Sequence, residues 1–215
     1  MVRLQISKNT ESTVLRYESK NIPEGAVIVY GTSDYAALTP AASLPVFNRS
    51  LAECRMEELL FFYSRLVRPC KPSVLVVGGF LNDYFSHVSV AETMFLLNRL
   101  LAYARTDNPG IRLLLTDLEP CIKYASESFA WSRFKRYRQA LHAELVQYCT
   151  AHPDTELLCF ASSAHFFRGA EACGDPDKMD TALFCEDGLH LNATGTEHFS
   201  AFLSERLCRE GINYV

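Results

Sequence analysis

Short apolar runs rich in β-branched residues alternate with longer segments in which apolar residues recur at helical spacing. The run Ala26–Tyr30 (AVIVY) is typical of a strand buried on both faces, as strands of parallel sheets are. The runs of this kind are residues 26–30, 44–48, 73–77, 111–116 and 156–160. Strands that alternate with helices pair in parallel, and the connecting helices cover both faces of the sheet. The sequence therefore predicts an α/β fold: a three-layer α/β/α sandwich of flavodoxin-like type, with a mostly parallel sheet of about five strands.

The segments between these runs carry the apolar spacing of amphipathic helices. The predicted helices are residues 52–67, 90–105, 128–151 and 193–208, the last of them capped by Asn192. No repeat, low-complexity tract or linker divides the chain, so residues 1–215 are expected to form one domain. Residues 1–24 are its N-terminal extension, in which Thr13–Tyr17 is predicted to be a short strand.

The distribution of charge argues against a nucleic-acid partner. The net charge is −4 with histidine neutral, and the lysines and arginines are scattered along the chain. One small basic group on the predicted helix 128–151 comprises Arg133, Lys135, Arg136 and Arg138. A solvated helix face accounts for this group, so no nucleic-acid partner is expected.

The sequence contains no pattern typical of a targeting or membrane segment. The N-terminus lacks an apolar core followed by a small-residue cleavage site, and no apolar run approaches the length of a membrane span. The eight cysteines include no C-x-x-C pair and no zinc-type spacing, and Cys149 and Cys159 lie in apolar patterns typical of small buried residues. We therefore expect a cytoplasmic protein with reduced thiols, no cofactor and no metal. The oligomeric state stays open.

The segment Gly31–Asp34 directly follows the first predicted strand. Open α/β sheets bind their ligands at the carboxyl ends of the strands, and Ser33 lies at such an end beside a glycine. Ser33 is therefore a candidate nucleophile. The alternative is that Thr32, Ser33 and Asp34 only cap a helix, a position that serine and aspartate favour.

Two further segments supply the groups that a serine nucleophile requires. Asp187 and His190 are three residues apart around a glycine, a spacing that lets the carboxylate hold one imidazole nitrogen and leave the other free as a base. Asn82 lies in the loop after the third predicted strand, at the same edge of the sheet as Ser33. The three signals together favour a catalytic serine. An α/β-hydrolase is disfavoured, because its G-x-S-x-G elbow is absent and Tyr35 stands where the second glycine would be.

On these residues the sequence resembles the SGNH (GDSL-type) hydrolase family of esterases and lipases, within it the platelet-activating-factor-acetylhydrolase-like branch. The first block of the family is matched by Gly31–Ser33, the third by Asn82–Asp83, and the last by Asp187–Gly195 (DGLHLNATG). Residues 44–49 (LPVFNR) also fit this branch, and the likeness covers about residues 26–208 in the order of the family.

The resemblance implies a serine esterase that needs no cofactor and acts through an acyl-enzyme. It assigns Ser33 as the nucleophile, His190 as the base and Asp187 as the carboxylate that orients the base. Asn82 and the backbone N–H of Ser33 would form the oxyanion hole. The implied substrate is a small-molecule ester: an acylated sugar, a lysophospholipid or another short acyl ester.

The sequence departs from the family pattern at two glycines. The glycine of the second block, whose N–H completes the oxyanion hole, is replaced where Ala52 and Glu53 stand, so their backbone N–H groups become the candidates. Phe80 replaces the glycine two residues before Asn82, and is expected to narrow the acyl pocket and favour acetyl or other short chains. The alternative function is a catalytically weak or inactive ligand-binding protein with the same fold.

Overall fold

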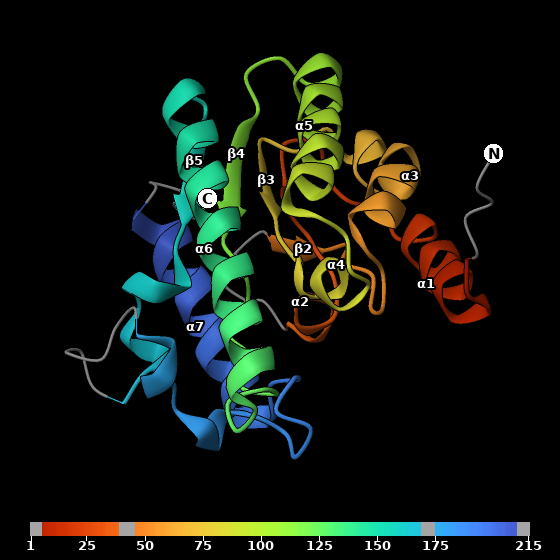
Figure 1. Ribbon diagram of the computed structural model, residues 1–215. Helices are drawn as coiled ribbons and strands as arrows, with labels where there is room; N and C mark the ends of the chain where they lie inside the picture. Colours follow the sequence, from red (N-terminus) through yellow and green to blue (C-terminus); the bar gives the residue numbers. More distant parts are fainter. Residues whose placement is uncertain (1–5, 39–45, 169–174, 210–215) are drawn as a thin grey trace.

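The computed structural model describes residues 6–38, 46–168 and 175–209 (Figure 1). Within these ranges the strands form one five-stranded sheet in the order β2-β1-β3-β4-β5, and every pairing is parallel. The strands are β1 (Val27–Tyr30), β2 (Val46–Asn48), β3 (Val74–Val77), β4 (Arg112–Thr116) and β5 (Thr155–Leu158). The predicted α/β class is confirmed, and all carboxyl ends of the strands lie at one edge of the sheet.

Helices cover both faces of this sheet. They are α1 (Lys8–Glu18), α2 (Asp34–Ala37), α3 (Met56–Leu66), α4 (Leu81–Phe85), α5 (Val90–Asp107), α6 (Ser128–Ala151) and α7 (Ala193–Arg209). Short 3-10 turns are η1 (Arg68–Cys70), η2 (Phe160–Ser162), η3 (Ala164–Phe166), η5 (Pro176–Lys178) and η6 (Thr181–Leu183). No helix in the described ranges has both the length and the apolar character required to cross a bilayer.

Alternation along the strands divides the core into two clusters. Ile28 of β1 and Leu75 of β3 point to the side covered by α3, α5 and α6, whereas Val29 and Val76 point to the side covered by α7. Successive side chains of a strand face opposite sides of the sheet, so a strand with two apolar faces needs a helical layer on each. The predicted three-layer arrangement is therefore confirmed.

The predicted strand Thr13–Tyr17 is wrong, because this segment belongs to α1. Ser7 caps the helix by accepting a hydrogen bond from the N–H of Thr10 at 3.1 Å. Thr10, Val14 and Tyr17 are buried and share one helical face, which packs against α3. The hydroxyl of Tyr17 donates to the carbonyl of Ser50 at 3.1 Å, so the described part of the N-terminal extension is attached to the sheet layer.

The longest helix, α6, has the predicted bounds, but its basic group is not wholly solvated. Arg133 and Arg136 are exposed, whereas Arg138 lies on the buried stripe and is 7% exposed. Cys159, predicted to be an apolar core residue, is half-buried and donates its thiol to a carboxylate oxygen of Asp117 at 3.1 Å. These two corrections concern the same end of the sheet.

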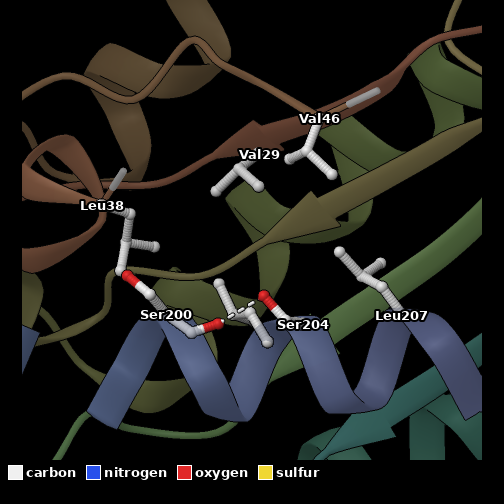
Figure 2. Close-up of a pocket in the computed structure, with 7 residues that line it drawn as sticks. Val29, Leu38, Val46, Ser200, Ser204 and Leu207 are labelled. Atoms are coloured by element: carbon white, nitrogen blue, oxygen red, sulfur yellow. Dashed lines mark hydrogen bonds between the residues drawn. The ribbon is translucent and has the colours of Figure 1, made fainter. Parts of the chain in front are cut away.

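A small apolar cavity lies between α7 and the edge of the sheet near β1 and β2 (Figure 2). Its lining is Val29, Leu38, Val46, Ser200, Leu203, Ser204 and Leu207. The volume of about 20 Å³ has room for roughly one water molecule. The hydroxyl of Ser204 donates to the carbonyl of Ser200 at 2.7 Å, so it is satisfied within the helix. This cavity is a packing gap of the α7 layer.

Candidate active site

Ser33 lies where β1 ends and α2 begins, in a conformation that serine rarely adopts. Its φ is 36° and its ψ is −102°, and its hydroxyl makes no capping hydrogen bond to α2. The interpretation of Ser33 as a helix cap therefore fails. Instead, Oγ accepts a hydrogen bond from Nδ2 of Asn82 at 3.1 Å. A non-glycine residue with positive φ stores strain, and such residues concentrate at functional sites.

Close packing between the loops after β1 and β3 holds this turn. The hydroxyl of Thr32 donates to the carbonyl of Gly79 at 3.0 Å. Gly79 has a φ of 97°, and a Cβ there would collide with the backbone nitrogen of Thr32. Only glycine meets both requirements, so the β3 loop can approach the backbone beside Ser33.

Asn82 and Asp83, at the start of α4, hold the turn that precedes α3. Nδ2 of Asn82 also donates to the carbonyl of Cys54 at 2.8 Å, which fixes the orientation of the amide because a carbonyl can only accept. Oδ2 of Asp83 accepts from the N–H of Met56 at 3.0 Å. Within this turn Glu53 has a φ of 62°, the left-handed region that favours glycine. Glu53 therefore has the backbone conformation typical of a glycine while carrying an exposed side chain.

Asp187 and His190 form the predicted carboxylate–imidazole pair. Oδ2 of Asp187 lies 2.7 Å from Nδ1 of His190, and Oδ1 accepts the backbone N–H groups of Leu189 and His190 at 2.9 and 3.0 Å. Burial opposes ionisation of Asp187, but these hydrogen bonds outweigh it and lower the pKa to about 2. The ionised carboxylate can only accept, so Nδ1 of His190 carries a proton, and in the neutral imidazole Nε2 then keeps its lone pair.

The loops that carry these two halves of the site are in contact. Oδ1 of Asp34, the residue after Ser33, accepts from the N–H of Leu191, the residue after His190, at 3.3 Å. Burial raises the pKa of Asp34 to about 6, while the Leu191 hydrogen bond and His190 oppose the rise. Within the described ranges, no hydrogen bond joins the side chains of Ser33 and His190 directly.

Glu119 is a buried residue of the site that the sequence reasoning missed. It follows β4 and is 2% exposed, and its Oε2 accepts from the N–H groups of Phe80 and Leu81 at 3.1 and 3.3 Å. Burial raises its pKa to about 8. Glu119 thus caps α4, the helix that presents Asn82. The sequence signal was a pair of acidic residues, Asp117 and Glu119, directly after an apolar strand run.

Phe80 does not lie where the sequence analysis expected it. Its side chain is fully buried in the hydrophobic cluster beneath α5 and α6. It is part of the core, so it gives no support to a narrowed acyl pocket. Three cavities among the described residues are lined by other residues than Ser33, Asn82 and His190.

No family model and no curated protein sequence matches the chain. Among solved structures, one from Streptococcus pneumoniae, provisionally assigned as a platelet activating factor, has a TM-score of 0.75 at 18% identity over 93% of both chains. A provisionally assigned acylhydrolase from Bacteroides fragilis has a TM-score of 0.72 at 13% identity and covers 96% of this chain and 99% of its own. A GDSL-like lipase from Bacteroides thetaiotaomicron has a TM-score of 0.69 at 15% identity, over 94% and 98%. The chain therefore has the fold that GDSL-type lipases and acylhydrolases share, over nearly its whole length.

Proposed function

We propose that the protein is a serine esterase that hydrolyses a small acyl ester through an acyl-enzyme on Ser33. The observation that carries this proposal is the contact between Asp34 and Leu191, because it brings the strained serine turn to the Asp187–His190 pair. The fold shared with GDSL-type lipases and acylhydrolases supports the same reaction class.

In the proposed reaction His190 removes the proton of the Ser33 hydroxyl through Nε2 as Oγ attacks the ester carbonyl. Asp187 holds the imidazole in the tautomer that accepts this proton and stabilises the imidazolium that forms. The imidazolium then protonates the departing alcohol. Water, activated by the same base, attacks the acyl-enzyme and releases the acid and the free serine.

The oxyanion is proposed to be held by Nδ2 of Asn82 and by the backbone N–H of Ser33. Asn82 already donates toward Oγ of Ser33, beside which the oxyanion develops. The turn that contains Ala52 and Glu53 is tied to Asn82 through the carbonyl of Cys54, and its backbone N–H groups are the proposed third donor. Catalytic hydrogen bonds of a free enzyme tighten when substrate binds, so we expect the Ser33–His190 contact to form in the complex.

We propose a short acyl group as the preferred substrate, for a different reason from the one that Phe80 suggested. The side chains of Asp187 and His190 are about half exposed, so this side of the proposed site is open to solvent. An acyl chain that stays in contact with solvent buries little apolar surface, so binding energy should not grow with chain length. Acylated sugars, lysophospholipids and short acyl esters share this chemistry. The cytoplasmic location expected from the sequence stays a prediction.

The alternative is a ligand-binding protein of the same fold, and the exposed carboxylate of Glu53 favours it. A negative side chain beside the proposed third donor would oppose a developing oxyanion. Hydrolysis of p-nitrophenyl acetate, compared with butyrate and octanoate, decides between the two functions. We expect turnover of the acetate, its loss in Ser33→Ala and its retention in the control Ser86→Ala, which alters an exposed serine just after α4.

A fluorophosphonate probe provides the second measurement. It should label the wild type and Ser86→Ala but not Ser33→Ala, because labelling requires an activated serine hydroxyl. A wild type that neither turns over esters nor reacts with the probe would leave the ligand-binding alternative.

A further inference from the structure

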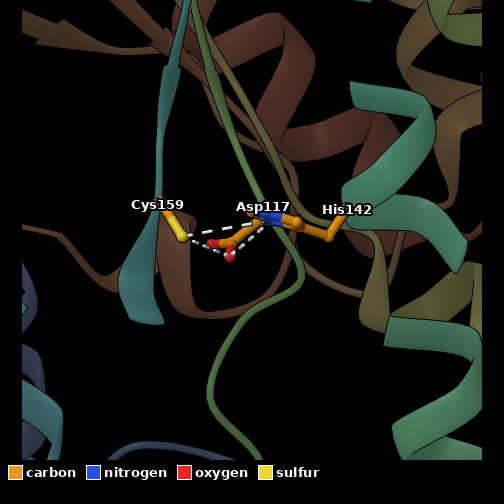
Figure 3. Close-up of side chains that lie close together, drawn as sticks. All are labelled: Asp117, His142 and Cys159. Atoms are coloured by element: carbon orange, nitrogen blue, oxygen red, sulfur yellow. Dashed lines mark hydrogen bonds and ion pairs between the residues drawn. The ribbon is translucent and has the colours of Figure 1, made fainter. Parts of the chain in front are cut away.

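Three metal-ligating side chains converge at the carboxyl ends of β4 and β5 (Figure 3). Asp117 directly follows β4, Cys159 directly follows β5, and His142 reaches them from α6. Sγ of Cys159 lies 3.1 Å from Oδ2 of Asp117 and 4.0 Å from Nδ1 of His142, and Nδ1 lies 3.6 Å from Oδ2. One atom of each residue therefore faces a common point.

We propose that Asp117, His142 and Cys159 bind a divalent transition-metal ion, zinc by preference. Zinc takes nitrogen, sulfur and oxygen ligands at about 2.0–2.3 Å in tetrahedral geometry, which places neighbouring ligand atoms roughly 3.3–3.6 Å apart. The three observed separations bracket that range. An ion can therefore be accommodated by side-chain adjustments of a few tenths of an ångström.

The backbone orients Asp117 for this role. Its Oδ1 accepts the N–H of Phe160 at 2.8 Å, and the residue is 1% exposed. One carboxylate oxygen is thereby held by the protein while the other faces His142 and Cys159. Hydrogen bonds that fix a ligating carboxylate in this way are the usual outer shell of a metal site.

A fourth coordination position is open to solvent. Asp117, His142 and Cys159 all line a cavity of about 590 Å³, ample for a water molecule or a small external ligand. Arg138 lines the same cavity, and its Nη1 and Nη2 have no hydrogen-bond partner among the described residues. The aspartate and thiolate ligands neutralise the two charges of the ion, so this guanidinium would face a neutral centre.

A cysteine nucleophile is a poorer interpretation of the same residues. Asp117 and Cys159 both approach Nδ1 of His142, whereas a catalytic base must lie between its carboxylate and its nucleophile. A metal ion would displace the proton of the Cys159 thiol to solvent and bind the resulting thiolate, as cysteine ligands require.

The test is titration of the reduced, metal-free full-length protein with Co²⁺, a spectroscopic substitute for zinc, using a phosphine reductant. One equivalent of Co²⁺ should produce a thiolate-to-cobalt charge-transfer band and intense visible d–d bands, and Zn²⁺ should abolish both. Cys159→Ser should lose the charge-transfer band. His142→Gln should keep the thiol and weaken Co²⁺ binding by about 100-fold or more, beyond what loss of an outer-shell partner costs.

The matched control is Cys149→Ser, which removes another half-buried cysteine, on the same helix as His142, and should leave the spectrum unchanged. Cys185→Ser and Cys208→Ser exclude the exposed thiols of the described residues as the source. His142 is 41% exposed at its side chain, so His142→Gln should fold even if Cys159→Ser does not. No charge-transfer band in the wild type, or unchanged Co²⁺ affinity in His142→Gln, overturns the proposal. Neither outcome depends on esterase activity.

Discussion

The carboxylate of Asp34 accepts a hydrogen bond from the backbone N–H of Leu191 although 157 residues separate them. Each is the direct neighbour of a proposed catalytic residue, Ser33 in one case and His190 in the other. Asp34 is 7% exposed, so the hydrogen bond is shielded from competing water. This hydrogen bond joins the loop that follows β1 to the loop that precedes α7.

Replacing Asp34 should separate the effect of the hydrogen bond from the effect of its charge. Asp34→Ala leaves the buried N–H of Leu191 unpaired and should lower the free energy of unfolding by about 1–3 kcal/mol. Activity should fall as well, since His190 loses its alignment with Ser33. Asp34→Asn retains a hydrogen-bond acceptor for the N–H of Leu191 and should keep most of the stability and most of the activity. Urea denaturation and ester turnover check this, and equal losses in the two variants would contradict a hydrogen-bonding role.

Asn82→Ala should lower the turnover number for p-nitrophenyl acetate by about 10²–10³, the cost of removing one oxyanion donor. The Michaelis constant should change little, because the donor acts on charge that develops after binding. Asn9→Ala, at an exposed position on α1, is the control. A purely structural role for Asn82 would instead lower the folded fraction, so turnover is normalised to fluorophosphonate-labelled sites.

The stability of the protein should fall as pH rises from about 4.5 toward 8, because Glu119 is buried with a raised pKa of about 8. The folded state then binds a proton that the unfolded state has released, so each pH unit costs up to about 1.4 kcal/mol. Glu119→Gln keeps an acceptor for the N–H of Phe80 and should flatten this dependence.

Asp83, whose pKa burial raises to about 7, contributes in the lower part of the same pH window. Asp83→Asn should therefore remove a different portion of the slope from Glu119→Gln. The measurement is the free energy of unfolding in urea at several pH values. An unchanged slope in both variants would show that neither carboxyl group is protonated in the folded state at neutral pH.

Glu53→Gly should raise the free energy of unfolding by up to about 1 kcal/mol, because glycine adopts a φ of 62° without strain. Glu53→Val should lower it, since a β-branched residue tolerates this region poorly. The glycine variant should also raise ester turnover if the carboxylate opposes the oxyanion. Turnover unaffected by Glu53→Gly would mean that this side chain plays no part in the reaction.

The sheet and its layers could be predicted because strands buried on both faces have a distinctive composition, as Ala26–Tyr30 does. The helix α1 was missed because Thr13–Tyr17 contains β-branched and aromatic residues, while the cap at Ser7 lies six residues earlier. The candidate site residues Ser33, Asn82 and Asp187 could be identified from the sequence because each lies at a predicted strand end or in a short motif.

The burial of Glu119 and Asp34 could not be predicted from the sequence, because it depends on the packing of loops that are distant along the chain. Phe80 was misplaced for a similar reason: the side chain turns into the core while its backbone N–H faces Glu119. The proposed metal ligands Asp117, His142 and Cys159 share no local spacing, and only the sheet brings them together.

The half exposure of His190 and Asp187 has a consequence for the fate of an acyl-enzyme on Ser33. Because the proposed base is exposed to bulk solvent, the site does not exclude small nucleophiles other than water. Added alcohols should therefore compete in proportion to their concentration, and the acyl group would be transferred to them as well as to water. The openness of this loop thus makes the proposed enzyme a transferase whenever an acceptor is abundant.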